Sequence, residues 1–306
     1  MIVSGGEALV DLVPAGSTMD LLAPRLGGGP YNVAVTAGRL GVPSAFLSRV
    51  STDGFGEALL TRLRESRVDT SLVQRGPEPT TLAVVAFDER SSARYSFYTE
   101  GTADRLVADP GPLPGSTAAL SLGTLGMVLE PGASVYETVL RRESGRGVLT
   151  ALDPNIRADL IVDANSYRAR FASWLPYVRL LKISLDDAEW LTGGGDVSAA
   201  AKSWLDAGVQ AVVLTKGADG LSVITPAGEL ATAPTRPTRL VDTIGAGDTV
   251  QGALLAWLVR HRVTDLSALG EDDWLAALGY AARAAAITVS RSGAEPPTET
   301  ELEHDH

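Results

Sequence analysis

Apolar residues follow two alternating patterns along the chain. Short apolar runs, typical of buried strands, alternate with segments whose apolar residues recur every three or four positions, typical of helices. The predicted strands cover residues 1–3 (continuing to 14), 44–50, 80–87, 94–98, 118–122, 147–152, 178–183, 210–215 and 221–225. The predicted helices include 32–40, one opening at 53–56, 134–142, 199–207, 250–258 and one from 274 to 285. This alternation predicts an α/β protein, and the fully apolar run 210–215 indicates a parallel sheet.

One pair of runs interrupts the alternation. Residues 80–87 and 94–98 are rich in β-forming side chains and are joined by the polar segment 88–93, a hairpin signal. We expect this hairpin to belong to a small sheet that stands off the core. No internal linker divides the rest, so residues 1–298 are predicted to form one α/β domain, followed by a disordered acidic tail at 299–306.

Composition narrows the functional classes. The chain has 306 residues, a net charge of −11, three histidines and no cysteine. The negative charge disfavours nucleic acid and anionic membranes as partners, and the lack of cysteine excludes disulfides and thiol catalysis. The sequence holds no apolar run long enough to cross a membrane and no signal-like beginning, so we expect a cytoplasmic protein.

The stretch 241–249, which leads into the predicted helix at 250–258, carries the strongest chemical signal. Gly245, Ala246 and Gly247 form a small-residue turn whose free amides suit an anion, and Asp248 follows them directly. A carboxylate at an anion site makes sense if Asp248 faces a hydroxyl that must lose its proton. The alternative is helix capping, with Asp242 or Asp248 as the N-cap and the glycines as turn formers.

Two motifs give the chain a family resemblance. Residues 242–248 read Asp-Thr-Ile-Gly-Ala-Gly-Asp, and residues 27–34 read Gly-Gly-Gly-Pro-Tyr-Asn-Val-Ala. In both, the chain resembles the PfkB (ribokinase-like) sugar kinases, and within them the bacterial fructokinases. The resemblance implies a three-layer α/β sandwich with a mostly parallel central sheet. It also implies a small β-sheet lid, built here from segments at about 12–27 and 80–104, through which the chain forms a homodimer.

The same resemblance implies an activity and a set of site residues. The activity is transfer of the ATP γ-phosphoryl group to a hexose hydroxyl, with fructose as the expected sugar. Asp248 would be the general base, and the amides of 245–247 would hold the phosphoryl group. The sugar-binding residues would be Asp11, Gly28, Gly29, Asn32, Tyr98 and Arg157. Alternatives remain for four of them: Asp11 as a turn or edge residue, Asn32 as an N-cap, Arg157 in a surface salt bridge, and Tyr98, like Phe97, packing within the lid.

The resemblance also implies a nucleotide site and two kinds of metal ion. Thr215, Gly217, Gly220 and Ala282 would line the nucleotide. Asp187, which stands where the family usually has glutamate, would act on Mg²⁺ through water. A potassium site would use Asp242, Ile244, Thr288, Arg291 and Gly293.

Other functions stay open at this point. The nearest is the same chemistry on 2-keto-3-deoxygluconate, whose carboxylate Arg157 would bind, and ribose or a nucleoside comes next. A non-catalytic sugar sensor that has kept the fold is the alternative from a different class.

Overall fold

A large central sheet forms the middle layer of the protein. The computed structural model describes residues 1–16, 19–87, 93–236 and 238–304. The strand order is β14 (Gly228–Ala233), β13 (Leu221–Thr225), β12 (Ala211–Thr215), β11 (Leu180–Ser184), β10 (Leu149–Asp153), β9 (Ala119–Gly123), β1 (Ile2–Gly5), β4 (Ser44–Ser51) and β5 (Val68–Asp69), with β6 (Val73–Gly76) also paired to β4. The pairs β12–β13 and β13–β14 are antiparallel, whereas the other pairs in this sheet are parallel. The predicted α/β class with a mostly parallel sheet is confirmed.

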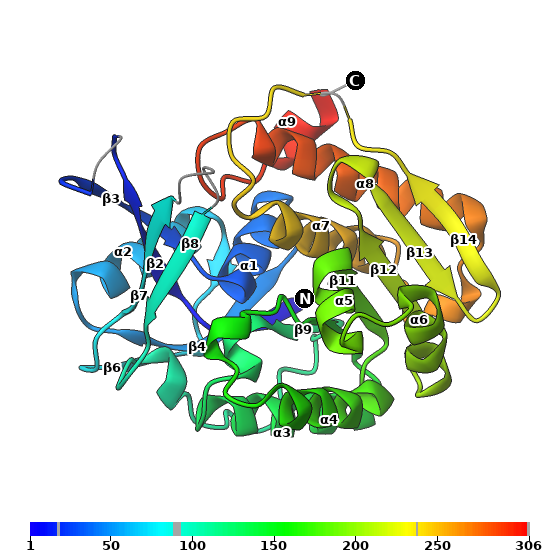
Figure 1. Ribbon diagram of the computed structural model, residues 1–306, viewed down its shortest axis with the longest axis horizontal. Helices are drawn as coiled ribbons and strands as arrows, with labels where there is room; N and C mark the ends of the chain where they lie inside the picture. The colour runs from blue at the N-terminus through cyan, green and yellow to red at the C-terminus, as the bar shows by residue number, and fades with distance from the viewer. Residues whose placement is uncertain (17–18, 88–92, 237, 305–306) are drawn as a thin grey trace.

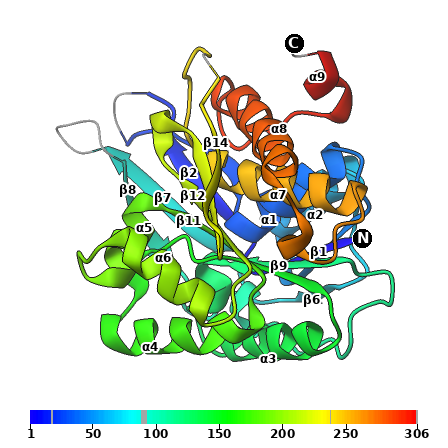
Figure 2. The same ribbon diagram turned by 90° about the vertical axis from the view of Figure 1, so that its right-hand side faces the viewer.

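Helices cover both faces of this sheet (Figures 1 and 2). One face carries α1 (Gly29–Arg39), α7 (Ala246–Arg260) and α8 (Glu271–Val289), whose apolar side chains form one core cluster with the strands. The other face carries α3 (Gly132–Gly145), α4 (Ala164–Trp174), α5 (Leu185–Thr192) and α6 (Val197–Asp206), which form a second cluster. Helix α2 (Gly54–Glu65) packs beside α1 and β4. The expected three-layer sandwich is therefore present.

A second, four-stranded sheet stands beside the central one. Its order is β3 (Leu22–Gly27), β2 (Leu9–Pro14), β7 (Thr81–Phe87) and β8 (Ala93–Tyr98). Figure 1 shows this sheet projecting from the main body, as expected for the lid. Strands β7 and β8 pair antiparallel as predicted, while the connecting residues 88–92 lie outside the described part of the chain.

Two expectations about the ends of the chain are wrong. The predicted single strand reaching residue 14 is two strands in different sheets, because the chain turns at Gly6 (φ 150°). A side chain at Gly6 would collide with Pro30, so the turn needs glycine. The tail predicted to be disordered forms helix α9 (Glu299–His304), since Leu302 is only 3% exposed and Glu301 pairs with Arg291 at 2.7 Å.

The remaining regular structure is short. There are 3₁₀ helices at Asp104–Leu106, Thr124–Met127, Ala158–Leu160, Leu175–Tyr177, Gly217–Asp219 and Leu266–Ala268. Among the described residues, no helix combines the length and the apolar character needed to span a bilayer.

Candidate active site

A polar cavity opens where the two motifs meet. It has a volume of about 230 Å³ and lies at the carboxyl ends of β1, β9, β10 and β11, the edge where open α/β sheets bind ligands. The two motifs contribute Gly28, Gly29 and Asn32 from one side and residues 243–245, 247 and 248 from the other. The lid contributes Asp11, Tyr95 and Phe97. Segments more than 200 residues apart in sequence therefore line one cavity.

Glu7 fixes the backbone at the first motif. Its Oε1 accepts a hydrogen bond from the Gly29 amide (2.9 Å), and its Oε2 accepts one from the Gly126 amide (3.0 Å). Burial raises the pKa of Glu7 to about 8. A Cβ at Gly29 would stand 2.4 Å from Thr124 Oγ1, so only glycine fits at the start of α1. The sequence analysis did not single out Glu7, although it lines the cavity and orders the glycine loop.

The second motif places a buried carboxylate at the amino end of α7. Gly245 adopts a left-handed conformation (φ 76°), and Asp248 stands in the first turn of the helix. Asp248 is 8% exposed, and its Oδ2 accepts a hydrogen bond from Asn32 Nδ2 (2.8 Å). The N-caps of α1 and α7 are Gly28 and Gly245, so the capping alternatives for Asn32, Asp242 and Asp248 are wrong.

The surroundings of Asp248 suit a general base. The pKa of Asp248 is raised to about 6, chiefly by burial and also by the negative charge of nearby Asp153. The hydrogen bond from Asn32 and the positive charges of Lys182 and Arg157 lower this pKa. A carboxyl group with this pKa is mostly ionised at neutral pH. It is also a stronger proton acceptor than an exposed aspartate.

Lys182 on β11 is a functional candidate that the sequence analysis missed. Its buried Nζ lies 2.6 Å from Asp153 Oδ2, and it lines the same cavity as Asp248. A Cβ at Gly247 would stand 2.9 Å from Lys182 Nζ, so the ammonium group lies directly against the glycine turn. The available signal was a single charged residue within the apolar run 180–183.

The lid presents a carboxylate and two rings to the cavity. Burial raises the pKa of Asp11 to about 6, and the positive charge of Arg157 partly opposes this. Tyr95 and Phe97 stack with ring centroids 5.9 Å apart. Tyr98 is 61% exposed and lies outside the lining, so the prediction that it covers the sugar is wrong. The reason is the two-residue period of β8, which puts Tyr95 and Phe97 on one face and Tyr98 on the other.

Arg157 and Asn155 lie at the carboxyl end of β10. Arg157 Nη1 donates to Asn155 Oδ1 (2.7 Å), and Asn155 Nδ2 donates to Thr124 Oγ1 (3.3 Å). All three residues line the cavity or support its wall. Arg157 forms no salt bridge with another described residue, which removes the surface salt-bridge alternative.

A second cavity of about 520 Å³ adjoins the first. Its lining brings together the four residues expected at the nucleotide, namely Thr215, Gly217, Gly220 and Ala282. Apolar side chains of α7, α8 and nearby segments form much of the remainder, including Leu240, Val250, Ala285, Ala286 and Val289. Thr243 and Gly247 line both cavities, so the two spaces meet at the glycine turn.

The proposed cation residues gather beside this turn. Asp242 Oδ1 accepts from the Ile244 amide (3.0 Å) and Oδ2 from the Gly293 amide (2.8 Å), while the Arg291 amide donates to the Thr288 carbonyl (3.0 Å). These contacts bring Asp242, Ile244 and Gly293 together, and the expected potassium site stays a prediction.

Direct coordination of a divalent ion has less support. In the part of the chain that the structure describes, no three His, Asp or Glu side chains are grouped as metal ligands. Asp187 lies outside the lining of both cavities, and its Oδ1 accepts from the Ile156 amide (2.9 Å). The expected action of Asp187 on Mg²⁺ through water stays a prediction.

The fold and the site together define a class of protein. A buried carboxylate lines a polar cavity and directly follows a glycine turn that this cavity shares with an adjoining, largely apolar cavity. This arrangement is that of a phosphotransferase with an alcohol acceptor. Residues 2–301 match the pfkB family carbohydrate kinases, and the chain belongs to that family.

Individual relatives agree with this assignment. A fructokinase of Rhizobium leguminosarum bv. trifolii is 39% identical over 262 residues, covering 84% of this chain and 79% of the relative. The structure of a Xylella fastidiosa fructokinase with bound ATP superposes with a TM-score of 0.89 at 26% identity, covering 99% of this chain and 97% of the other. A fructokinase double mutant from Vibrio cholerae O395, with fructose, ADP and potassium ion bound, gives a TM-score of 0.86 at 26% identity, covering 99% and 96%.

Proposed function

We propose that this protein is an ATP-dependent fructokinase. The observation that carries the proposal is the position of Asp248, which is buried in the polar cavity, hydrogen-bonded to Asn32, and directly follows Gly247, a residue that lines both cavities. Relatives named fructokinase, one of them with ATP bound and another with fructose and ADP bound, support the choice of substrates.

In the proposed reaction Asp248 removes a proton from a fructose hydroxyl. The freed oxygen attacks the γ-phosphorus of ATP, the bond to the β-phosphate oxygen breaks, and ADP leaves. The amides of Gly245 and Gly247 would hold the transferred group at the positive end of the α7 dipole, whereas the Ala246 amide donates to the Thr243 carbonyl (3.2 Å). Lys182 adds a positive charge beside Gly247, where negative charge develops during transfer.

The second cavity is the proposed ATP site. Ala282, Ala285 and Ala286 on α8 would form a flat apolar wall against the adenine, and Gly217 and Gly220 let the backbone approach it. Mg²⁺ bound to the ATP phosphates would neutralise part of their charge, with Asp187 acting only through water. Asp242, Ile244, Thr288, Arg291 and Gly293 would hold K⁺, the ion bound in the Vibrio cholerae fructokinase double mutant.

The sugar cavity favours a neutral hexose over an acidic sugar. The carboxylate of Asp11 would accept hydrogen bonds from sugar hydroxyls but would repel the carboxylate of 2-keto-3-deoxygluconate. Arg157 is the cation available to such an acid, and its Nη1 already donates to Asn155 and to the Ile156 carbonyl. Tyr95 and Phe97 offer apolar surface to the face of a sugar ring.

Measuring ADP formation with a panel of sugars tests the proposal. We expect fructose to give the highest kcat/KM, ahead of ribose and 2-keto-3-deoxygluconate, in the presence of Mg²⁺. Replacing K⁺ by a bulky organic cation should lower the rate. Sugar binding without ADP formation would instead establish a non-catalytic sensor, and a preference for the acidic sugar would overturn the role given to Asp11.

The lid is also the proposed dimer surface. Large apolar side chains on or next to it are exposed, including Leu21, Met19 and Tyr98. Light scattering after size-exclusion chromatography should give twice the monomer mass of 31.9 kDa. Tyr98→Ser should lower that mass if the lid forms the interface, and an unchanged mass would locate the interface elsewhere.

A further inference from the structure

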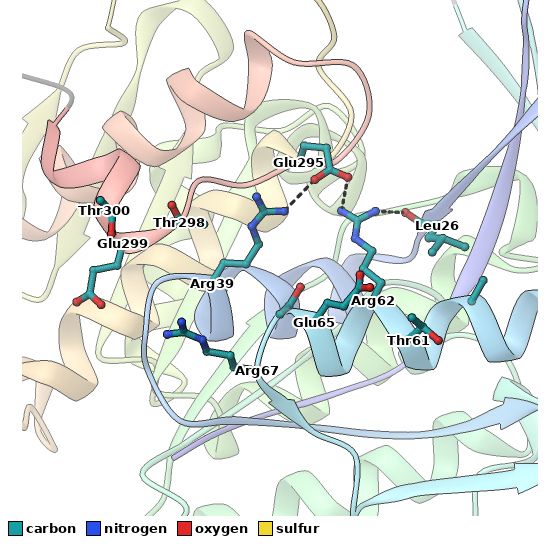
Figure 3. A pocket seen from close by; sticks show the side chains of 12 residues that line it. Leu26, Arg39, Thr61, Arg62, Glu65, Arg67, Glu295, Thr298, Glu299 and Thr300 are labelled. Carbon is teal, nitrogen blue, oxygen red and sulfur yellow. Dashed lines mark hydrogen bonds and ion pairs between the residues drawn. The ribbon is translucent and has the colours of Figure 1, made fainter.

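A third cavity lies away from the active site, beside the carboxyl ends of α1 and α2. Its volume is about 800 Å³, and its walls come from α1, α2, the turn after α2 and the segment 295–300 (Figure 3). Three arginines from these elements line it: Arg39, Arg62 and Arg67. Neither motif of the active site contributes to it, and the proposed reaction makes no use of it.

The arginines are unequally satisfied. Glu295 bridges two of them, with Oε2 2.9 Å from Arg39 Nη1 and Oε1 2.9 Å from Arg62 Nη2. Figure 3 shows both guanidinium groups reaching toward this one carboxylate. The Nε of Arg39 is buried without a hydrogen-bond partner, and Arg67 has no side-chain partner among the described residues. Arg67 thus offers donors for an anion that is not part of the chain, and Arg39 could bind that anion in exchange for Glu295.

The rest of the lining limits what that anion can be. Glu65 has no ion pair with any described residue, and the threonines at 61 and 300 add hydroxyl groups. The unpaired carboxylate of Glu65 and the unpaired guanidinium group of Arg67 fit a molecule with one anionic end and one hydroxyl-rich end. A compact polyanion would be repelled by Glu65, Glu295 and Glu299. No described aromatic side chain is available in the lining to stack on a nucleobase.

We propose that this cavity binds a phosphorylated sugar, with the phosphate on Arg67 and Arg39 and the sugar hydroxyls on Glu65. Such a ligand is also of the chemical class that the proposed reaction forms. A bound phosphate would compete with Glu295 for Arg39 and Arg62, because all these groups share one cavity.

Glu295 connects this cavity to the active site. The preceding residue, Ala294, packs against the anion turn, since a Cβ at Gly245 would stand 2.4 Å from the Ala294 Cβ. The Gly293 amide is held by Asp242 Oδ2 at 2.8 Å. A bound phosphate that draws Arg39 and Arg62 away from Glu295 would break the ion pairs that hold residues 293–295 in place. Binding of the sugar phosphate should therefore lower turnover. This regulatory half rests on the proposed function.

Calorimetry with glucose 6-phosphate tests the binding half of the proposal, namely that this cavity binds a sugar phosphate. Fructose and a non-hydrolysable ATP analogue are present at saturation, so that both active-site cavities are filled. Arg67→Gln should weaken binding about 10-fold, the loss expected for one charge-assisted hydrogen bond. Arg64→Gln, on the same helix as Arg62 but outside the lining, should bind as the parent does. Glu295→Gln should bind more tightly, because it removes the competing carboxylate.

Several results would overturn the binding half. These are an absence of binding, equal weakening in Arg64→Gln and Arg67→Gln, or inorganic phosphate binding as tightly as the sugar phosphate. None of them depends on turnover, so they are distinguishable from failure of the fructokinase assay.

Initial rates test the regulatory half. Glucose 6-phosphate should lower kcat without raising the KM for fructose, and Arg67→Gln should keep the parent kcat and lose this inhibition. Inhibition that persists in Arg67→Gln, or that is purely competitive with fructose, would assign the effect to the active site.

Discussion

The pH dependence of turnover follows from two carboxyl groups in the sugar cavity. Burial raises the pKa of both Asp248 and Asp11 to about 6. Asp248 must be ionised to accept the hydroxyl proton. With a pKa of about 6, the ionised fraction falls from nearly complete at pH 8 to about one tenth at pH 5, so kcat should fall about 10-fold.

The specificity constant should fall more steeply than kcat. In the free enzyme Asp11 must also be ionised, so that it can accept hydrogen bonds from the sugar hydroxyls. The ionised fractions of Asp11 and Asp248 at pH 5 are each about one tenth, and their product gives about a 100-fold loss of kcat/KM between pH 8 and pH 5. Asp11→Asn should raise the KM for fructose at pH 8. The same substitution should reduce the acidic loss of kcat/KM to about 10-fold, because only Asp248 then titrates.

The assay is direct chromatographic measurement of ADP, which avoids coupling enzymes that fail in acid. Asp196→Asn is the matched control, since Asp196 is an exposed helix N-cap remote from both cavities, and it should leave the profile unchanged. A kcat that stays constant down to pH 4.5 would refute the assignment of a buried carboxylate as base. An Asp11→Asn variant with the parent's two-group profile would refute the role of Asp11.

Three further predictions concern the supports of the site. Lys182→Met combined with Asp153→Asn, which avoids an unpaired buried carboxylate, should lower kcat at least about 10-fold, because it removes the ammonium group beside Gly247. The acidic limb of kcat should not move to higher pH, because the substitutions remove the raising effect of Asp153 on the pKa of Asp248 together with the lowering effect of Lys182; a kcat within a few-fold of the parent contradicts the role of Lys182. Gly245→Ala should lower both kcat and Tm because its Cβ would collide at 2.4 Å, whereas the control Gly279→Ala, in open space on α8, should raise the unfolding free energy by about 0.5–1 kcal/mol. Burial makes the native state bind a proton at Glu7 that the unfolded chain releases, so the unfolding free energy should fall by about 1 kcal/mol per pH unit between pH 6 and 8. Urea titrations should show this slope, and Glu7→Gln should remove most of it, leaving a smaller contribution near pH 6 from Asp11 and Asp248, whose pKa values burial also raises.

Much of the fold could be predicted because its determinants are local. Apolar runs and periodic segments located most of the central strands and helices, and the two motifs marked the loops at the sheet edge. The gathering of Asn32 and Asp248 also followed, since both lie in the first turn of helices that pack on the same face of the central sheet.

The residues that the sequence analysis missed depend on long-range contacts. Glu7 acts through amides 22 and 119 residues away, and Lys182 gains its role from Gly247, which belongs to another motif. The tail composition suggested disorder, but one leucine in the core and ion pairs with Arg260 and Arg291 fold it into α9. The hairpin pattern did not predict which aromatic rings of β8 face the cavity, because that depends on the register with which β8 pairs with β7.

The most direct test of the account is the turnover of Asp248→Asn. The asparagine side chain can still accept the hydrogen bond from Asn32, so the cavity should keep its shape while the base is lost. We predict that kcat for ATP-dependent fructose phosphorylation falls at least about 100-fold, with calorimetric binding of fructose and ATP retained. Turnover within a few-fold of the parent enzyme would contradict the claim that this buried carboxylate takes the proton.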